Sequence, residues 1–228
     1  MYGVINRSNF EAEQNFDIEI YKNSVNLSRS EETGCLLFIE FAGDKLAEVE
    51  ERFDSCSRKL SDKCTIIESA GDEQSLIRMW AARKNALNRA TKFTVGSRKP
   101  IGLIEDTVVQ PDMLHHHALH LLQMYSENRL DYVMYGHAGD GNLHTRPLID
   151  LGSQSETRLI YRLANQVFQR VIKLGGTITA EHGDGLARAK YIESVYGPRI
   201  YYLFKEIKKL FDPRCIMNVG KKVIQPRN

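Results

Sequence analysis

The sequence predicts an α+β protein in which a mainly antiparallel sheet is covered by helices. Two observations lead to this fold class. Short apolar segments typical of strands alternate with longer segments whose apolar residues recur at helical spacing. Two of the strands also follow each other across a glycine-rich turn, which is an antiparallel connection. The order of elements is that of two split βαβ units in succession.

The composition is that of a globular protein with no general affinity for polyanions. The 228 residues are 42% hydrophobic and 26% charged, with a formal net charge of +2, so we expect no nucleic-acid partner. No apolar run approaches the roughly 20 residues of a membrane span, and the N-terminus lacks the apolar core of a signal peptide. The four cysteines lack metal-binding spacing, and we expect reduced thiols in a cytoplasmic protein.

The N-terminal part of the chain contains a polar segment and then regular elements. Residues 1–32 are polar and weakly periodic, and we expect a lead-in of uncertain order before a folded domain at 33–228. The first elements of this domain are a strand at 35–41, a helix from Asp44 to about Leu60, a strand at 64–68 and a helix from Asp72 to about Arg89. Asp44 stands where an N-cap side chain accepts hydrogen bonds from first-turn amides.

Alternation and β-branched residues predict the next strand, at 101–109. Pro111 then favours a helix start, because its fixed φ suits the first turn and its missing N–H is not needed there. The remaining elements are a helix at 111–128, strands at 130–135 and 143–148, a helix at 153–174, a strand at 177–179, and helices at 186–196 and 199–211. Gly175 and Gly176 end the long helix.

Four of the seven histidines lie inside a predicted helix, in the segment 113–120. His116 and His120 are four residues apart and therefore share a helix face. The segment has no carboxylate in the His-Glu-x-x-His arrangement of zinc hydrolases. We therefore interpret these histidines as a partly solvated helix face.

The other three histidines occur in two glycine-rich segments. His137 and His144 bracket a turn in Gly-His-Ala-Gly-Asp-Gly-Asn-Leu-His, at 136–144. Glycines at this density suit backbone that turns sharply or lies close to another group. A turn between two strands brings both imidazoles to the same sheet end, which is the beginning of a divalent metal site.

A third ligand is available in the second segment, 177–185, which contains Glu181 and His182. Adjacent side chains on extended backbone point to opposite sides, so we expect Glu181 to face the metal and His182 to face a substrate. Two imidazoles, one carboxylate and an open position, beside a free base, are typical of catalytic metal sites. The alternative is that both segments are plain turns with hydrogen-bonded histidines. We interpret Asp140 and Asp184 as turn residues.

These two segments resemble the C-terminal domain of the FAD-linked oxidases. That family includes D-lactate dehydrogenase, the D subunit of glycolate oxidase and D-2-hydroxyglutarate dehydrogenase. The resemblance extends from about Trp80 to Lys222 and includes Glu105-Asp106-Thr107 and the segment 211–221. It implies two ferredoxin-like halves that share one sheet. It also implies oxidation of a D-2-hydroxy acid to the 2-oxo acid, with hydride transfer to FAD.

The resemblance implies roles for individual residues as well. His137, His144 and Glu181 match the ligands of a divalent metal, usually zinc. His182 matches the catalytic base that takes the proton of the 2-hydroxyl group. Arg83, three residues after Trp80, matches a residue that binds the substrate carboxylate, and a guanidinium can do so through two parallel hydrogen bonds.

Four further residues are candidates for binding. Arg146 is two residues from His144, so on a strand it faces the same side and is a candidate for a second substrate carboxylate. Arg188 and Lys221 are candidate contacts to substrate or to the flavin phosphate. Asn142 is a candidate for the cofactor region, where it either orients a ligand histidine or, as we favour, pairs with the turn backbone.

The resemblance places the FAD-binding domain before this one, and residues 1–79 lack a glycine-rich pyrophosphate loop. We therefore expect FAD to be bound mainly by a domain or subunit outside this chain. The Leu-His-x-Arg-Pro pattern at 143–147 resembles a branch of large flavoproteins with iron–sulfur domains. It implies an iron–sulfur electron-transfer partner and, as an alternative location, peripheral attachment to a membrane through an acceptor complex.

Two other functions stay open on the sequence. A metal-dependent hydrolase would use the same three ligands and open position to activate water. A non-catalytic assembly subunit would retain the motifs without activity.

Overall fold

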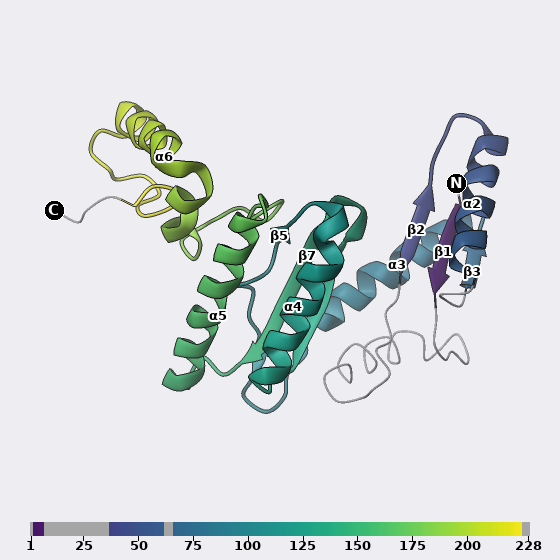
Figure 1. The fold of residues 1–228 in the computed structure, drawn as a ribbon, viewed down its shortest axis with the longest axis horizontal. Helices are drawn as coiled ribbons and strands as arrows, with labels where there is room; N and C mark the ends of the chain where they lie inside the picture. The colour runs from purple at the N-terminus through teal and green to yellow at the C-terminus, as the bar shows by residue number, and fades with distance from the viewer. Residues whose placement is uncertain (1, 7–36, 62–65, 225–228) are drawn as a thin grey trace. The chain divides into compact units, whose positions relative to one another are not determined.

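The computed structural model describes residues 2–6, 37–61 and 66–224, which fall into two compact units, Met1–Phe93 and Thr94–Asn228 (Figure 1). The first unit has a three-stranded antiparallel sheet in the order β2-β1-β3. Its elements are β1 (Tyr2–Asn6), β2 (Phe38–Phe41), α2 (Leu46–Leu60), β3 (Ile66–Ala70) and α3 (Glu73–Ala90). β1 lies within the segment expected to be a lead-in, and residues 7–32 lie outside the described residues.

The two helices of the first unit differ in their N-caps. Asp72 caps α3, because its Oδ1 accepts a hydrogen bond from the Ser75 amide at 2.9 Å. The cap expected at Asp44 is wrong, since the N-cap position of α2 is Lys45 and has no side-chain hydrogen bond. α3 packs on the sheet of this unit, where Leu76 and Met79 are buried against Phe38 of β2.

The second unit has a four-stranded antiparallel sheet built around one strand. β7 pairs along its length with β6, and its two ends pair on the other side with β4 and β5. The elements are β4 (Lys99–Pro100), β5 (Thr107–Val108), η1 (Pro111–Met113), α4 (Leu114–Glu127), β6 (Tyr132–His137), η2 (Ala138–Asp140), β7 (Asn142–Ile149), α5 (Gln154–Lys173), η3 (Ala189–Tyr191) and α6 (Ile192–Phe211).

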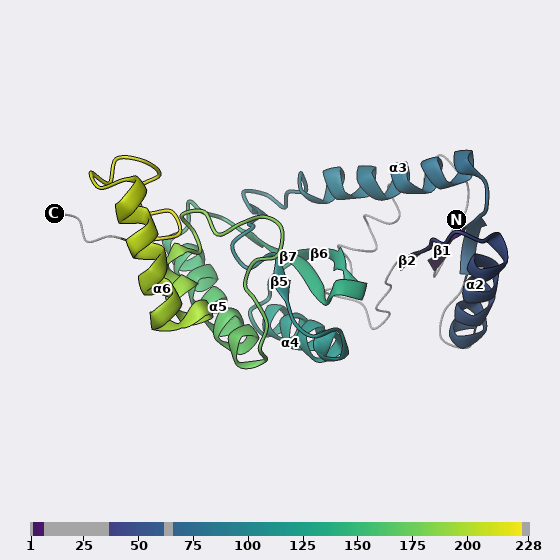
Figure 2. The same cartoon turned by 90° about the horizontal axis from the view of Figure 1, so that it is seen from above.

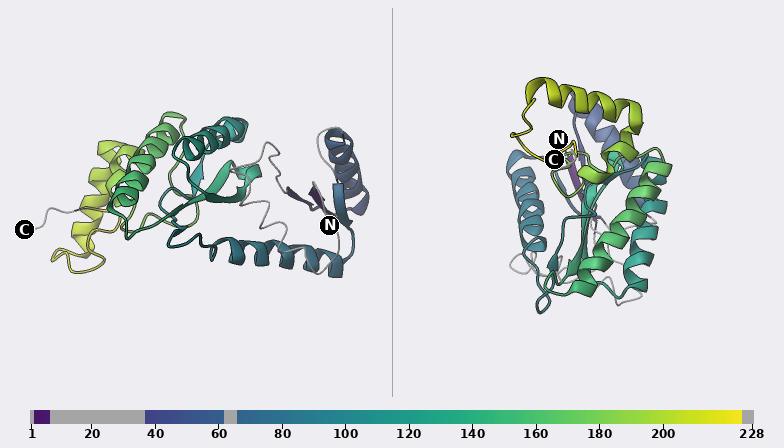
Figure 3. Two further views of the ribbon diagram at one scale, coloured as in Figure 1. Left: turned by 90° about the horizontal axis from the view of Figure 1, so that it is seen from below. Right: turned by 90° about the vertical axis from the view of Figure 1, so that its left-hand side faces the viewer.

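The arrangement confirms the α+β class with antiparallel strands. α4 and α5 lie side by side over one face of the second sheet (Figures 2 and 3). The described strands form two sheets, one in each unit, where the resemblance implied one shared sheet. Among the described helices, none has both the length and the hydrophobicity that crossing a bilayer requires.

Regular packing explains why the long helices were predictable. α5 has an apolar face with helical spacing, and every residue of that face is buried: Ile160, Leu163, Ala164, Val167, Phe168 and Val171. Ser153 is its N-cap, accepting from the Glu156 amide. Burying a large aliphatic or aromatic side chain contributes about 1.5–3 kcal/mol, so this face suffices to hold the helix on the sheet.

Two segments predicted to be strands, 101–109 and 177–179, differ from that prediction in the structure. The single strand expected over 101–109 is wrong, because residues 101–106 separate β4 from β5. Asp106 within this segment has a φ of 72°, which a pleated strand does not accommodate. The strand expected at 177–179 is also wrong, and only an isolated bridge joins Val108 to Thr177.

The first of the two expected C-terminal helices begins later in the chain than predicted. The helix expected at 186–196 starts later, with η3 and then α6. The break expected between 196 and 199 is present, because Gly197 within α6 has a non-helical φ of 78° and separates two helical stretches. Gly197 and the following Pro198 account for the kink, because neither residue continues an α-helix without strain.

The turn between β6 and β7 depends on one glycine. Gly141 has a φ of 68°, and a Cβ on it would lie 1.9 Å from the backbone oxygen of Val109. The close approach is part of the sheet, because the Val109 amide donates to the Gly141 carbonyl at 3.0 Å. A side chain here would push the β6–β7 turn away from the end of β5.

We predict that Gly141→Ala lowers the free energy of unfolding by about 2 kcal/mol or more, through left-handed strain and the backbone clash. Urea unfolding followed by circular dichroism measures the change. Gly139→Ala is the matched control in the same turn, because its Cβ would meet nothing within 4 Å. Equal effects of the two substitutions would contradict this account of the turn.

One histidine of α4 belongs to the core and not to a solvated face. His117 is 0% exposed, and its Nε2 lies 3.0 Å from the Thr107 hydroxyl on β5. His115 and His116 are exposed, so the expected solvated face is correct for them and wrong for His117. Burial, followed by the charges of His120 and Arg170, lowers the pKa of His117 from 6.5 to about 4.

We predict a pH-dependent loss of stability from this residue. Between its unfolded and folded pKa values the unfolded chain binds more protons at His117, so stability falls as the pH decreases from about 6.5 towards 4. The loss of folding free energy from this residue reaches about 2 to 3 kcal/mol at pH 4.5. Urea unfolding between pH 7.5 and 4.5 should show a shallower pH dependence for His117→Gln than for His115→Gln. The same slope in both variants would refute the prediction.

Candidate metal and substrate site

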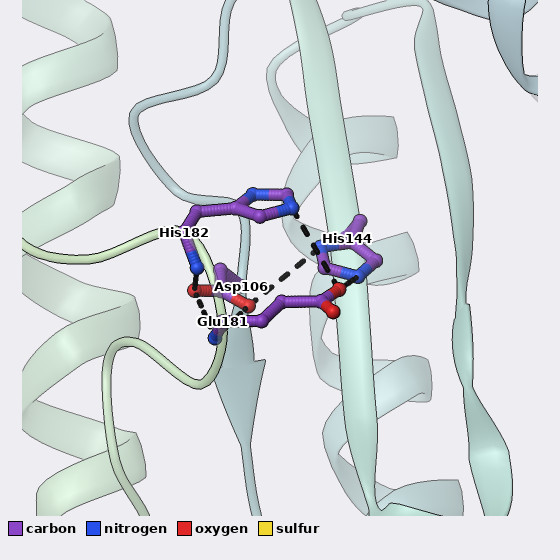
Figure 4. A group of neighbouring side chains, drawn as sticks. All are labelled: Asp106, His144, Glu181 and His182. Carbon is purple, nitrogen blue, oxygen red and sulfur yellow. Dashed lines mark hydrogen bonds and ion pairs between the residues drawn. The ribbon is translucent and has the colours of Figure 1, made fainter.

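Three segments that are distant in the sequence meet in the second unit: the residues before β5, the β6–β7 hairpin and the loop after Thr177. Figure 4 shows four side chains from these segments, Asp106, His144, Glu181 and His182. One potential ligand atom from each of the four lies within 4.8 Å of the others. The two glycine-rich motifs therefore converge in space.

Of the three expected metal ligands, the two histidines both lie close to one carboxylate oxygen of the third, Glu181. Glu181 Oε1 lies 2.8 Å from His144 Nε2 and 3.4 Å from His137 Nε2. Ligand atoms around a tetrahedral zinc ion, with bonds of about 2.0–2.1 Å, are about 3.3 Å apart. Each imidazole is thus near the distance from the carboxylate oxygen that a shared cation requires. His144 is buried, whereas His137 and Glu181 are exposed to solvent.

His182 also faces this cluster. Its ring stacks on that of His144, with centroids 4.7 Å apart, and its Nε2 is 3.7 Å from Glu181 Oε1. The expectation that Glu181 and His182 point to opposite sides is wrong. The alternation rule holds for extended backbone, and residues 177–182 form an irregular loop. His182 rather than His137 completes the tightest group, so two imidazoles compete for the third ligand position.

Asp106 is the hydrogen-bond acceptor that shapes this loop. Its Oδ2 accepts from four donors: the Thr179 hydroxyl at 2.9 Å and the amides of Ala180 at 2.8 Å, Glu181 at 3.2 Å and His182 at 2.9 Å. Asp106 is 0% exposed. Burial alone raises the pKa of this carboxyl, but the hydrogen bonds outweigh it and hold the pKa below its ordinary value.

Glu105 positions the other imidazole. Its Oε1 lies 3.3 Å from His182 Nδ1, and its Oε2 accepts a hydrogen bond from Arg146 Nε. An ionised carboxylate only accepts, so a hydrogen bond at this contact has its proton on Nδ1 of His182. Arg146 lies on the same side as His144, as expected, but its Nε is bonded to a carboxylate of the protein itself.

His144 has an unusual buried atom. Burial, and then the charge of the neighbouring His182, lower the pKa of His144 below its ordinary value. The neutral form, which binds metals, is therefore favoured. Its Nδ1 is buried without a hydrogen-bond partner and lies 3.8 Å from Asp106 Oδ1. A buried polar nitrogen beside a carboxylate fits the outer side of a metal-bound imidazole.

Two other candidate residues lie beside the cluster and bind the protein. Asn142 is buried, and its Nδ2 donates to Asp106 Oδ1 at 3.3 Å and to the Thr107 carbonyl at 3.4 Å. The favoured pairing with its own turn is therefore not the contact that forms. Arg188 is buried as well, and its Nη1 donates to the Gly183 carbonyl at 3.0 Å. Roles of both residues in cofactor binding stay predictions.

The remaining expected residues have other surroundings. Lys221 is exposed, with its Nζ 3.5 Å from Asn218 Oδ1. Arg83 belongs to α3 in the first unit, where its guanidinium lies 5.8 Å from the centre of the Trp80 ring. The role of Arg83 in substrate binding stays a prediction. Asp184, expected to be a turn residue, is buried in an ion pair with Lys222.

Sequence reasoning missed Glu105 and Asp106 as site residues. Both are buried, and both contact the Glu181–His182 segment. A signal was present, since two consecutive carboxylates interrupt an otherwise apolar stretch at 101–109. Buried acidic residues need partners, and an acidic pair in a predicted strand therefore indicates a site.

Comparison with known proteins places this chain in one family. A family model described as FAD linked oxidases, C-terminal domain, matches residues 7–222, and the chain belongs to this family. D-2-hydroxyglutarate dehydrogenase of Haemophilus influenzae is 32% identical over 193 residues, which are 82% of this chain and 19% of that protein. The glycolate oxidase subunit GlcD of Bacillus subtilis is 30% identical over 155 residues, 68% of this chain and 32% of that protein.

Other relatives agree with this assignment. D-lactate dehydrogenase of Archaeoglobus fulgidus is 32% identical over 128 residues, 56% of this chain and 28% of that protein. The chain thus spans about a fifth to a third of the length of these relatives. A 4-ethylphenol oxidase from Gulosibacter chungangensis has a similar fold, with a TM-score of 0.57 and 12% identity, over 99% of this chain and 54% of that one.

Proposed function

We propose that this chain is the substrate-side domain of an FAD-dependent dehydrogenase that oxidises a D-2-hydroxy acid to the 2-oxo acid. The observation that carries the proposal is the convergence of His137 and His144 on Glu181, beside His182, in a member of the FAD linked oxidases. D-2-hydroxyglutarate is the first substrate to test, because proteins with that name match over 82% of the chain. D-lactate and glycolate are the other members of the class.

The donor set fits a divalent cation, preferably zinc. Two imidazole nitrogens and one carboxylate oxygen suit a catalytic site that keeps a position open for substrate. The buried Nδ1 of His144 supports the fit, because a ligating imidazole turns its other nitrogen towards a carboxylate. In this proposal His137, His144 and Glu181 hold the cation, and His182 stays free.

His182 is the proposed base. Its Nε2 takes the proton of the substrate's 2-hydroxyl, and Glu105 at Nδ1 holds the ring and stabilises the imidazolium that forms. A cation held by His137, His144 and Glu181 would polarise the hydroxyl, and FAD would supply the acceptor for the hydride that leaves C2. Arg83 is proposed to orient the substrate carboxylate, and Arg146 to hold Glu105 in place.

The flavin and the electron acceptor complete the proposal. The relatives extend well beyond the part that matches this chain, which leaves length for an FAD-binding domain. We place FAD mainly on that domain or on a separate subunit. An iron–sulfur protein is the proposed electron acceptor, supported by the Leu-His-x-Arg-Pro pattern at 143–147.

We predict that the purified chain binds about one equivalent of zinc and that His137→Ala reduces this stoichiometry to the background level, because one of three protein ligands is lost. Elemental analysis after dialysis against zinc measures the content. His115→Ala, an exposed histidine of α4, is the control and should retain the metal. Unchanged zinc in His137→Ala would remove this residue from the site and favour His182 as the third ligand.

We predict that His182→Gln lowers kcat by about 10²- to 10⁴-fold, the usual contribution of a general base. Dye reduction by D-2-hydroxyglutarate, D-lactate and glycolate is measured in the flavin-containing protein that includes this chain. His116→Gln, exposed on α4, should keep full activity. A wild-type rate in His182→Gln would exclude it as the base. A flavin-loaded protein that oxidises none of the three acids would refute the proposed substrate class.

A further inference from the structure

We infer that Asp106 is a positioning residue for the proposed metal site. Its single carboxylate arranges the loop that carries Glu181 and His182, faces Nδ1 of His144, and stays outside the coordination sphere of the cation. The inference rests on the proposed function, because it concerns the same metal site. By distance alone Asp106 would be grouped with the metal ligands, and the inference assigns it the role of orienting those ligands instead.

The first part concerns the loop. The amides of Ala180, Glu181 and His182 are consecutive, and all three lie within 3.2 Å of Asp106 Oδ2. Successive amides that point to one spot form a concave anion site, and here the anion is a side chain of the same chain. This curled backbone, in place of an extended one, is why Glu181 and His182 both project towards His144 (Figure 4).

The second part concerns His144. Its Nε2 is directed at Glu181 Oε1, and its Nδ1 is a buried nitrogen without a hydrogen-bond partner, 3.8 Å from Asp106 Oδ1. A ligating imidazole usually donates its second N–H to a carboxylate, which sets the tautomer and the ring orientation. A shift of about 1 Å would bring Nδ1 to hydrogen-bond distance. Asp106 thus places the proton on Nδ1 and leaves the Nε2 lone pair for the cation.

The third part is that Asp106 has little capacity left for a metal. A carboxylate offers about four lone-pair positions. Oδ2 already has four donors, with Thr179 in addition to the three amides. Oδ1 accepts from Asn142 Nδ2 at 3.3 Å and faces His144. A cation on Oδ2 would displace the donors that hold the loop of Glu181, and a cation on Oδ1 would displace Asn142 and separate the carboxylate from Nδ1 of His144.

Asp184 provides a matched control for a purely structural role. Asp184 lies on the glycine-rich loop that carries Glu181 and His182, and like Asp106 it is buried. Its carboxylate pairs with the Lys222 ammonium at 2.8 Å. Both aspartates therefore contribute to the fold, but only Asp106 contacts the amides of Glu181 and His182 and faces His144. A role in stability alone predicts similar consequences for Asp106→Asn and Asp184→Asn.

The test measures zinc affinity by calorimetry and the visible spectrum of bound Co²⁺, using the full 228-residue chain. In Asp106→Asn an NH₂ group replaces one acceptor oxygen, and we expect zinc to bind about 10- to 100-fold more weakly, with an altered Co²⁺ spectrum. Asp184→Asn should keep both at the wild-type values. Binding by Asp106→Asn within twofold of wild type, with the same spectrum, would overturn the inference while leaving the metal site intact. A wild-type chain that binds no zinc would overturn both.

A second measurement does not depend on the variant folding. Nitrogen-15 NMR of the zinc-loaded wild-type chain reports which imidazole nitrogen carries the proton. We expect His144 to carry it on Nδ1 and to bind through Nε2. The opposite tautomer, with metal on Nδ1, would refute the pairing of His144 with Asp106.

Discussion

A buried carboxylate, that of Asp106, is the constraint on which the site depends. An ionised carboxylate that is removed from water is costly unless hydrogen bonds replace its hydration. Asp106 is 0% exposed and receives donors from Thr179, from three successive amides and from Asn142. The same hydrogen bonds fix a loop that has no regular secondary structure of its own. Loss of this acceptor would leave several buried donors unsatisfied at once.

The site joins a rigid half to an irregular half. His137 and His144 belong to the β6–β7 hairpin, in which Tyr135 pairs with His144 and His137 with Asn142. Glu181 and His182 belong to the loop that Asp106 holds. The antiparallel pairing sets where the first two imidazoles lie, and hydrogen bonds to one side chain set where the second pair lies. Rigid strands that position loop residues are a common basis for functional sites.

Two of the carboxylates near the imidazoles lie beside guanidinium groups. Glu105 is bonded to Arg146, and Arg188 Nη1 lies 3.7 Å from Asp106 Oδ2. Burial and then the charge of His182 lower the pKa of His144, and they outweigh the carboxylates of Asp106, Glu181 and Glu105, which raise it. Neutral imidazole is the form that metal binding and proton abstraction both require. The arrangement therefore suits the chemistry proposed for a member of the FAD linked oxidases.

Local patterns in the sequence were sufficient for the α+β class, for most helices, and for the meeting of His137 and His144, because helical spacing and a glycine turn between strands act over a few residues. The family motifs were equally readable. Only the tertiary structure showed that Glu181 and His182 face the same way and that Asp106 is responsible. The reason is distance along the chain: Asp106 bonds to residues 73 to 76 positions later, and no periodicity encodes such a contact. The strand expected at 101–109 is interrupted at Asp106, whose φ of 72° is not that of a strand although its amide still donates to the Leu143 carbonyl of β7.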